Sequence, residues 1–526
     1  MTLPGVTMIF KSPHAAISIP NITISEFLLQ DAEQHGPKTA LIEGTSGRSI
    51  SYQQLRPSIR SLAAGLASQG VKQGDVFAIY CPNLPEYVLA FHAVTTLGAV
   101  ATMVPTLLTG GEVASQLEDS NARYLLTIPA LMERAREAAK SAQIEKIFAI
   151  GEADGAISFS SLMSGDHNIP NVRLQPDADI AALPYSSGTT GFPKGVMLTH
   201  RNLVAMLCQM NAIAPLNEGD TVLCVVPMYH LYGLHVVANL ALANGATVVT
   251  LPRFELSEFL KTLEKYRVTV APLVPPLVLT LSRSPEVDNY DLSHLRLIHC
   301  GAASLSDDVA RACAQRLGCD IRYGYGLTEV SPLSHVTTDP AEHKKGSVGH
   351  CLPNTECRIV DYSNGHELGP NEEGEIWIRG PQVMKGYLGN PTATAEMLDA
   401  EGWLRSGDVG YVDEDGHLFV VDRVKELIKY KGRQVAPAEL EAVLLSHPQI
   451  ADAAVIPSHD EEAGEVPKAF VVLRSGAKAN AEEIMEFVAQ RVAPHKRVRR
   501  LEFVEQIPKS LAGKILRRVL IEKDRN

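Results

Sequence analysis

The sequence predicts an α/β fold in three parts. Apolar strand-like segments alternate with helical segments over about 41–150 and again over 221–317, and repeated βα units of this kind predict largely parallel sheets covered by helices. From about residue 346 to 421, short strands stand among Gly, Asp and Asn turns, which predicts a small β-rich subdomain. The remaining residues form a separate α+β pattern. We therefore expect an N-terminal domain over 1–424 and a C-terminal domain over 425–526.

Individual elements follow from local patterns. Ser51 begins a helix whose apolar residues recur at helical spacing, and Gly70 ends it. The continuous apolar run 76–80 is typical of a buried strand. The same reasoning predicts strands at 101–104, 124–127, 221–225, 246–251, 295–299, 356–360, 374–379, 417–421, 453–456 and 469–473. It predicts helices at 85–97, 130–142, 231–243, 256–266, 306–317, 438–446 and 481–492.

Length and composition limit the function classes. The chain has 526 residues, of which 45% are apolar and 21% charged, as expected for a globular enzyme with more than one domain. Its formal net charge is −12 and it has no long basic run, so we expect no nucleic-acid partner. The short basic cluster 496–500 is interpreted as a solvated face.

No targeting or membrane segment is expected. Residues 1–20 lack a basic start followed by an apolar core, and the segment 88–108 contains His92 and Pro105. The residues 523–526 are no peroxisomal signal. The eight cysteines include no Cys-x-x-Cys pair, which favours reduced thiols and a cytoplasmic protein without a transmembrane segment.

The clearest chemical motif is the loop 185–195, which follows an apolar strand at 180–184. It carries four Ser and Thr hydroxyls, three glycines and one lysine within ten residues. Glycines let backbone N–H groups turn inward, and the hydroxyls and Lys194 add donors and charge, which suits a polyphosphate. Pro193 and Gly195 depart from a Walker A motif. A nucleotide loop is favoured over a flexible surface loop.

Four other segments are candidates for a role in the chemistry. In 323–329, two glycines permit close backbone approach, aromatic rings could stack on a base, and Thr-Glu suits a hydrated Mg²⁺. In 402–408, an aspartate beyond a turn could accept ribose hydroxyls. Segment 422–432 places four cations in nine residues at the domain junction, and 507–514 is a Gly-tipped loop that ends in lysine. A turn, a solvated face and a surface loop would also explain the last three.

In order and spacing, these motifs resemble the adenylate-forming superfamily of acyl-CoA synthetases, luciferases and adenylation domains. The resemblance extends from about residue 25 to 522 and is nearest to the 4-coumarate–CoA ligases; 186–194 together with 426–439 makes a chance match implausible. It implies that a carboxylate attacks the α-phosphate of ATP and leaves an acyl-adenylate. The mobile C-terminal domain then rotates, and the CoA thiol attacks the activated carbonyl. Implied partners are a small carboxylic acid, ATP, CoA and Mg²⁺.

The same resemblance assigns roles to residues. Lys514 bridges the carboxylate and the α-phosphate, Glu329 helps to place Mg²⁺, and Lys425 is the hinge. The implied catalytic residues are Lys514, His230, Thr328 and Glu329. The implied nucleotide contacts are Ser186, Ser187, Gly188, Thr189, Thr190, Lys194, Gly324, Tyr325, Thr328, Asp408, Arg423, Lys425, Lys429, Gln434 and Lys514. The implied CoA contacts are Arg253, Lys431 and Gly432. The implied acyl pocket contains His230, Tyr232, Val236, Ala302, Ala303, Tyr323, Gly324 and Val330.

Some positions depart from the plant ligases. They are Arg253 in place of a lysine, Tyr323 in place of a glutamine, His235 and Val236 in place of small or polar residues, and Arg433 in place of an aromatic residue. Ala302 and Ala303 leave room for a planar ring or a chain. Tyr232 could stack on an aromatic acid, and its hydroxyl could meet a phenol. Together these features favour a 4-coumarate or cinnamate-type acid.

Several alternatives stay open. A medium-chain fatty acyl-CoA synthetase or a luciferase-like enzyme shares every nucleotide motif. An amino-acid adenylation domain is disfavoured, because no Asp or Glu between Thr221 and Arg253 could pair with a substrate amine. A non-catalytic ATP-binding homologue is more remote, because it would have no need to retain Lys194, Glu329, Asp408 and Lys514 together.

Overall fold

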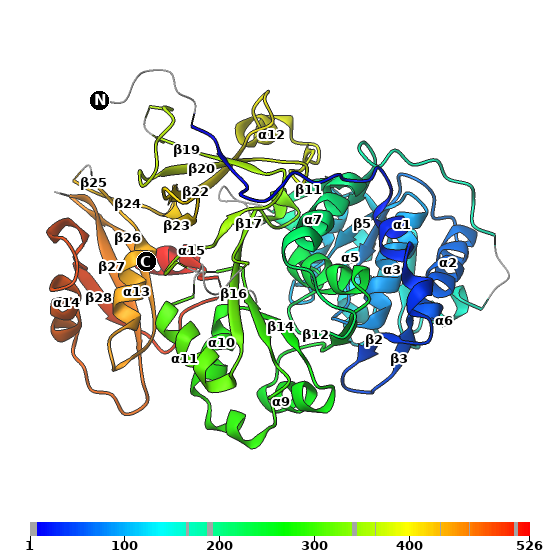
Figure 1. Cartoon of the computed structure of the whole chain (residues 1–526), viewed down its shortest axis with the longest axis horizontal. Helices are drawn as coiled ribbons and strands as arrows, with labels where there is room; N and C mark the ends of the chain where they lie inside the picture. Colours follow the sequence, from blue (N-terminus) through cyan, green and yellow to red (C-terminus); the bar gives the residue numbers. More distant parts are fainter. Residues whose placement is uncertain are drawn as a thin grey trace.

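Two large sheets with their helices form the main body of the protein, and two smaller sheets lie beside it (Figure 1). The computed structural model describes residues 8–164, 168–186, 193–303, 305–338, 344–362, 364–431, 433–461, 463–509 and 514–525. In Figure 1 the first large sheet is mostly blue to cyan and the second is mostly green. The third sheet is mostly yellow, and the fourth is orange to red.

The first sheet contains nine strands within the described ranges, in the order β10-β11-β9-β5-β4-β6-β7-β8, with β21 paired to β11. Its inner pairs, from β9 to β8, are parallel, whereas β11 pairs antiparallel with β9 and β10. The strands are β4 (Val76–Ile79), β5 (Val100–Met103), β6 (Ala122–Thr127), β7 (Lys146–Ala149), β8 (Ile157–Ser158), β9 (Ile180–Ala182), β10 (Tyr185–Ser186), β11 (Lys194–Thr199) and β21 (Gly386–Tyr387).

The second sheet has the order β18-β17-β16-β15-β14-β12-β13-β2-β3 among the described residues. The run from β16 to β2 is parallel, and both ends are antiparallel. The strands are β2 (Thr39–Glu43), β3 (Ser49–Ser51), β12 (Thr221–Cys224), β13 (Thr247–Thr250), β14 (Val270–Leu273), β15 (Leu297–Cys300), β16 (Asp320–Tyr325), β17 (His335–Val336) and β18 (His350–Cys351).

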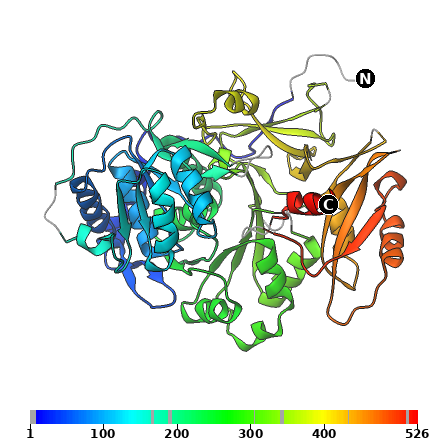
Figure 2. The ribbon, with the colours of Figure 1, turned by 180° about the vertical axis from the view of Figure 1, so that it is seen from behind.

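Helices cover these sheets, as Figure 2 shows from behind for the first sheet. Ser51 caps α2 through a capping box with Gln54, which explains where that helix begins. The helices are α1 (Ile24–Leu29), α2 (Tyr52–Ser68), α3 (Pro85–Thr96), α4 (Gly110–Asp119), α5 (Met132–Ser141), α6 (Phe159–Leu162), α7 (His200–Ile213), α8 (Leu240–Ala243), α9 (Leu256–Lys265), α10 (Pro275–Arg283) and α11 (Asp307–Leu317). Short 3₁₀ turns are η1 (Ala32–His35), η2 (Pro129–Leu131), η4 (Pro285–Asn289) and η5 (Thr328–Val330), and η3 (Tyr232–Asn239) is a π-helix.

The two smaller sheets are mainly antiparallel. The third has the order β1-β19-β20-β22-β23, and the fourth has β25-β24-β27-β26 with β28 beside β27. Their elements are β1 (Phe10–Lys11), β19 (Glu356–Val360), β20 (Gly374–Arg379), α12 (Pro391–Met397), β22 (Leu404–Val412), β23 (Leu418–Arg423), β24 (Ile428–Tyr430), β25 (Arg433–Val435), α13 (Pro437–Leu445), β26 (Ile450–Asp460), β27 (Gly464–Leu473), α14 (Ala481–Ala489), η7 (Pro494–Lys496), β28 (Arg500–Phe503) and α15 (Arg517–Arg525).

The apolar core follows this division. The largest cluster joins the first three sheets, with members such as Phe77, Val222 and Ile376. The fourth sheet has its own cluster, which includes Ile428 and Val471. A unit with its own core can move as a body, which is the property that the expected C-terminal domain requires.

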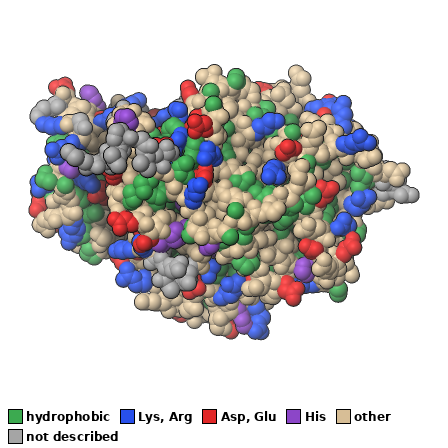
Figure 3. All heavy atoms as spheres, turned by 45° about the horizontal axis from the view of Figure 1, so that its top comes forward, with side chains coloured by type: hydrophobic (Ala, Val, Ile, Leu, Met, Phe, Trp, Pro, Cys, Tyr) green, Lys and Arg blue, Asp and Glu red, His purple; other side chains and the backbone are tan. Residues whose placement is uncertain are grey.

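The predicted fold class is confirmed. Most predicted elements lie within two residues of the observed ones, but the predicted helix at 231–243 begins as a π-helix. The sequence reasoning missed β14 and α10, and it missed that β1 pairs with β19 in the β-rich part. On the face shown in Figure 3, basic and acidic side chains are interspersed. Among the described helices, none has the length and apolar character needed to cross a membrane.

Candidate active site

The predicted nucleotide loop closes a β-hairpin. β10 and β11 pair antiparallel, and the register places Ser186 opposite Lys194 at the base of the loop. The expected phosphate contacts Ser187, Gly188, Thr189 and Thr190 lie outside the described residues. The two residues that flank them are therefore side by side, a hydroxyl and an ammonium at the entrance to the loop.

Glu329 lies next to this hairpin. It is only 5% exposed, on the short turn η5, and its Oε1 accepts hydrogen bonds of 2.8 Å from the Ser186 hydroxyl and from the Tyr387 hydroxyl. A buried carboxylate beside the Ser186 hydroxyl, with Thr328 next to it in the sequence, offers the oxygen ligands that Mg²⁺ prefers. These residues therefore fit a hydrated magnesium ion, as the sequence implied for Glu329.

The expected adenosine contacts come from three strands, the ends of β16 and β23 and the middle of β22. Tyr325 ends β16, and its hydroxyl donates to Asp408 Oδ2 at 2.7 Å. Asp408, on β22, also pairs through Oδ1 with Arg423 Nε at 3.0 Å, and Arg423 ends β23. Gly326 must be glycine, because a Cβ would lie 2.0 Å from the Pro332 carbonyl oxygen. The structure thus assembles the predicted ribose pair beside the predicted adenine contact.

Lys514 reaches this group of residues from the other end of the chain. Burial lowers its pKa, the positive charge of Arg423 lowers it further, and Asp408, Glu329 and Glu426 oppose the shift. His230 lies near the same ammonium group, since burial and Lys514 together lower the pKa of His230 to about 4. Although surrounding protein atoms lower both pKa values, the side chains of His230 and Lys514 are exposed, so both are accessible to a ligand.

The expected acyl-pocket residues come from η3 and the residues just before it, from β16, from the segment after β15 and from η5. Val236 is 8% exposed, while Ala302 and Ala303 are exposed and follow Gly301, where a Cβ would lie 3.5 Å from the Tyr232 ring. Val330 is fully buried and presents no surface to a cavity. Tyr323 and Gly324 lie on β16, with Tyr323 partly exposed.

The expected role of the Tyr232 hydroxyl needs adjustment. This hydroxyl donates to backbone carbonyl oxygens, at 2.8 Å to His299 and 3.2 Å to Leu273. Its one hydrogen is therefore already used inside the protein. Tyr232 can offer its ring to an aromatic substrate, but its hydroxyl could only accept a hydrogen bond from a phenol.

The expected residues near the adenylate and CoA form a looser group. The side chains of Arg253, Lys425, Lys429 and Lys431 are exposed, whereas Gln434 is partly buried and its Oε1 is buried without a hydrogen-bond partner among the described residues. Gly432 lies outside those residues. A buried amide oxygen of this kind is available to a ligand.

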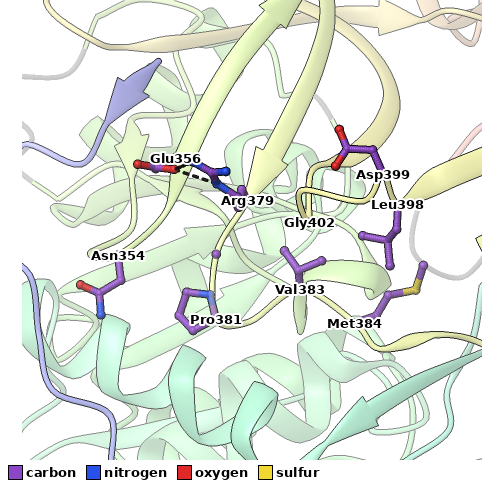
Figure 4. A pocket seen from close by; sticks show the side chains of 10 residues that line it. Asn354, Glu356, Arg379, Pro381, Val383, Met384, Leu398, Asp399 and Gly402 are labelled. Atoms are coloured by element: carbon purple, nitrogen blue, oxygen red, sulfur yellow. Dashed lines mark hydrogen bonds and ion pairs between the residues drawn. The ribbon is translucent and has the colours of Figure 1, made fainter. Parts of the chain in front are cut away.

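A cavity of about 480 Å³, shown in Figure 4, is lined by residues of the β-rich part and the segment 380–384. Glu356 and Arg379 face each other on its wall, with Arg379 Nε donating to Glu356 at 2.9 Å. Met384 also lines it and connects it to the site, because its backbone N–H donates to the Glu329 carbonyl oxygen at 2.8 Å. The predicted catalytic residues do not line this cavity.

Comparison with known proteins identifies the family. The family model for AMP-binding enzymes matches residues 28–388, and the model for the AMP-binding enzyme C-terminal domain matches 439–514. The chain belongs to the AMP-binding enzyme family. The first match contains the nucleotide loop and Glu329, and the second ends at Lys514.

Relatives of this AMP-binding enzyme match over nearly its whole length. A 4-coumarate:CoA ligase 1 from Petunia hybrida is 43% identical, with 98% of this chain and 96% of the relative covered. A 4-coumarate–CoA ligase 1 from Solanum tuberosum is 42% identical over the same shares. These relatives confirm the predicted superfamily and the predicted class of enzyme, an AMP-forming acid–CoA ligase.

Solved structures agree with this assignment. ATP-bound MatB from Rhodopseudomonas palustris superposes with a TM-score of 0.88 at 27% identity, covering 96% of this chain and 99% of that one. The anthranilate CoA ligase AuaEII in complex with anthranoyl-AMP also gives 0.88, at 26% identity, covering 97% and 98%. Since both superpose along almost the whole chain, the fold of this AMP-binding enzyme is a shared one.

Proposed function

We propose that this AMP-binding enzyme joins a 4-coumarate or cinnamate-type acid to CoA through an acyl-adenylate, with ATP as the source of the adenylyl group. The observation that carries the proposal is the convergence of Lys514 on Glu329, Asp408 and Arg423. These residues lie far apart in the sequence, and the fold brings an ammonium group from the C-terminal part to a nucleotide-like site. The full-length similarity to 4-coumarate–CoA ligases supports the choice of acid.

In the proposed first step, the barrier is lowered mainly by positioning of the reactants and by charge neutralisation. Attack of a carboxylate on a phosphate brings two anions together, so a fixed cation at the point of attack lowers the barrier. Lys514 is placed to supply that cation, while Asp408 and Arg423 hold the ribose. A Mg²⁺ ion held by Glu329 would neutralise phosphate charge.

His230 has a protonation state that suits an orienting role. With a pKa of about 4, its imidazole is neutral at neutral pH. A neutral imidazole can donate a hydrogen bond to the acid without forming a full ion pair, which would make the carboxylate a weaker nucleophile. We therefore assign His230 to orient the acyl carboxylate rather than to carry charge.

The second step requires a different arrangement of the C-terminal residues. We place the domain boundary between Val424 and Lys425, in the turn that joins β23 and β24, so that rotation there would withdraw Lys514 and bring in Lys431. Arg253, Lys431 and Gly432 are proposed for CoA. A cytoplasmic location is proposed as well, supported by eight cysteines that are all free.

The choice of acid rests on the pocket residues. Tyr232 presents a ring beside Gly301, and the small residues Ala302 and Ala303 follow, which leaves space for a flat substrate. A medium-chain fatty acid is the second candidate, because Val236 and Tyr232 form an apolar wall that discriminates weakly among shapes that fit.

The test compares 4-coumarate, cinnamate, octanoate and palmitate by kcat/KM for thioester formation. The proposal expects the two aromatic acids to exceed both fatty acids. A clear preference for octanoate or palmitate would replace the acid assignment and leave the ligase chemistry intact. Failure to release pyrophosphate with any acid would contradict the ligase chemistry itself.

A further inference from the structure

Tyr387 touches both charged side chains at the base of the nucleotide loop. Its hydroxyl donates to Glu329 Oε1 at 2.8 Å, and its ring lies beneath the Lys194 ammonium group, with 5.3 Å from Nζ to the ring centre. The second distance is within the range of a cation–π interaction. One buried side chain, 4% exposed, therefore contacts the expected metal carboxylate and the expected phosphate cation.

The hydrogen bonds on Glu329 are asymmetric. Within the described residues, the hydroxyls of Ser186 and Tyr387 both donate to Oε1. Two donors on one oxygen fix the plane of the carboxylate and leave Oε2 as the oxygen that can face a cation.

The backbone holds Tyr387 in this place. β21 pairs with β11 so that Tyr387 lies opposite Val196, two residues after Lys194. The Tyr387 N–H donates to Thr394 Oγ1 at 2.9 Å, which ties it to α12. The tyrosine is therefore fastened to the same strand that carries the loop lysine, and its position cannot change without that of β11.

We propose that Tyr387 is a positioning residue that orients the Glu329 carboxylate for a divalent cation and holds the Lys194 ammonium group beside it. The proposal rests on the proposed function, since it assumes that a metal-bound polyphosphate occupies this site. It adds a residue that no motif in the sequence indicated. Mutations can separate the two contacts of Tyr387, because its hydroxyl donates to the Glu329 carboxylate and its ring contacts the Lys194 ammonium group.

The experiment measures binding rather than turnover. Mn²⁺ is titrated into the full chain in the presence of α,β-methylene-ATP. The electron paramagnetic resonance signal of free Mn²⁺ gives its free concentration, and hence its affinity for the protein. Nucleotide affinity without metal is measured separately by calorimetry. The variants are Tyr387→Phe, which removes only the hydroxyl, and Tyr387→Leu, which removes the ring as well. The matched control is Tyr52→Phe, because the buried Tyr52 hydroxyl also donates inside the protein, at 2.6 Å to the Ala246 carbonyl oxygen.

Tyr387→Phe is expected to weaken Mn²⁺ binding about tenfold, as loss of a hydrogen bond to a metal-binding group commonly does, and to leave metal-free nucleotide affinity unchanged. Tyr387→Leu is expected to weaken both. Tyr52→Phe should change neither, although it lowers Tm. Mn²⁺ affinity of Tyr387→Phe within twofold of wild type overturns the proposal. If the wild type binds Mn²⁺ with nucleotide but forms no adenylate, the proposed function fails while the role of Tyr387 stands.

Discussion

At the scale of a single residue, the Lys514 ammonium group is surrounded by charged groups from several parts of the chain. Burial and then the charge of Arg423 lower the pKa of Lys514, whereas Asp408, Glu329 and Glu426 oppose this shift. The ammonium group therefore lies within electrostatic range of both the predicted ribose pair and the predicted metal carboxylate. The same ammonium group lowers the pKa of His230. Under the proposed function, a cation in this position would stabilise the negative charge that develops during adenylation.

Replacement of Lys514 by alanine is expected to slow adenylation by about 10²–10³-fold, the usual cost of losing one charge-stabilising group. Thioester formation from supplied acyl-adenylate and CoA should remain near the wild-type rate. Lys509→Ala is the matched control, because Lys509 lies in the same predicted loop but pairs with Asp452 at 2.7 Å. Equal loss in both half-reactions would show that Lys514 does not act in adenylation alone.

At the scale of an element, the π-helix η3 is held by a chain of buried polar groups. Asn239 Nδ2 donates to His235 Nδ1 at 3.2 Å, and His235 Nε2 donates to the Leu203 carbonyl oxygen at 2.9 Å. Asn239 Oδ1 accepts from His92 Nε2 at 3.1 Å. His235 Nδ1 can accept this hydrogen bond only while the imidazole is neutral. The chain joins α3, η3 and α7 behind the expected acyl pocket.

The pH dependence of stability follows from this chain. Burial lowers the pKa of His92 to about 4 and that of His235 to about 3. Both residues stay neutral in the folded protein while the unfolded chain takes up protons below about pH 6.5, so stability is complete above that pH. As pH falls from 6.5 towards 4, the free energy of unfolding should decrease by about 1.4 kcal/mol per pH unit for each histidine.

Thermal melting between pH 5 and 7 checks this expectation. His92→Gln should lower Tm at pH 7 and make its further decrease towards pH 5 smaller than in the wild type. His366→Gln, at an exposed position, should leave the pH dependence unchanged. A wild-type slope in His92→Gln would mean that His92 is not held neutral by the fold.

At the scale of the whole molecule, the C-terminal part is joined to the rest through a turn, a few polar contacts and a small apolar cluster of Val409, Leu427 and Ala436. Arg517 pairs with Glu441 and Glu426 at 2.8 and 2.7 Å, which fixes α15 to the residues that follow the turn. The Ala438 N–H donates to Asp422 Oδ2 at 2.8 Å across it. Rotation about Lys425 would keep the ion pairs of Arg517 and break the hydrogen bond between Ala438 and Asp422. In the structure Lys514 lies within electrostatic range of Glu329, Asp408 and Arg423, which is the arrangement that the proposed adenylation step requires.

Lys425→Pro is expected to slow domain rotation, because proline restricts the backbone at the proposed hinge. A rotation barrier higher by about 1.4 kcal/mol would lower the overall rate of thioester formation about tenfold. Adenylation should change little, since the observed arrangement already serves it. Stopped-flow release of pyrophosphate and formation of the thioester measure the two steps separately. An equal decrease in both, with an unchanged melting curve, would contradict domain alternation.

The sequence was informative wherever chemistry and local pattern coincide. Ser186, Lys194, Asp408 and Arg423 were indicated by their motifs, but of the strands that carry them only β23 was predicted, as 417–421. Tyr387 was missed because a tyrosine in a segment with glycines on both sides resembles an ordinary turn. Its contacts also depend on the pairing of β21 with β11, two strands that are almost two hundred residues apart in the chain. The π-helix was missed because its apolar periodicity is close to that of an α-helix.

The most direct test of the central claim is a rapid-quench measurement with 4-coumarate, ATP and Mg²⁺, first without CoA and then with it. The account predicts that one equivalent of coumaroyl-adenylate accumulates on the enzyme without CoA, together with one equivalent of pyrophosphate. Added CoA should then convert the adenylate to coumaroyl-CoA and release AMP. Formation of the thioester without a preceding adenylate, or no adenylate from any carboxylic acid, would contradict the account.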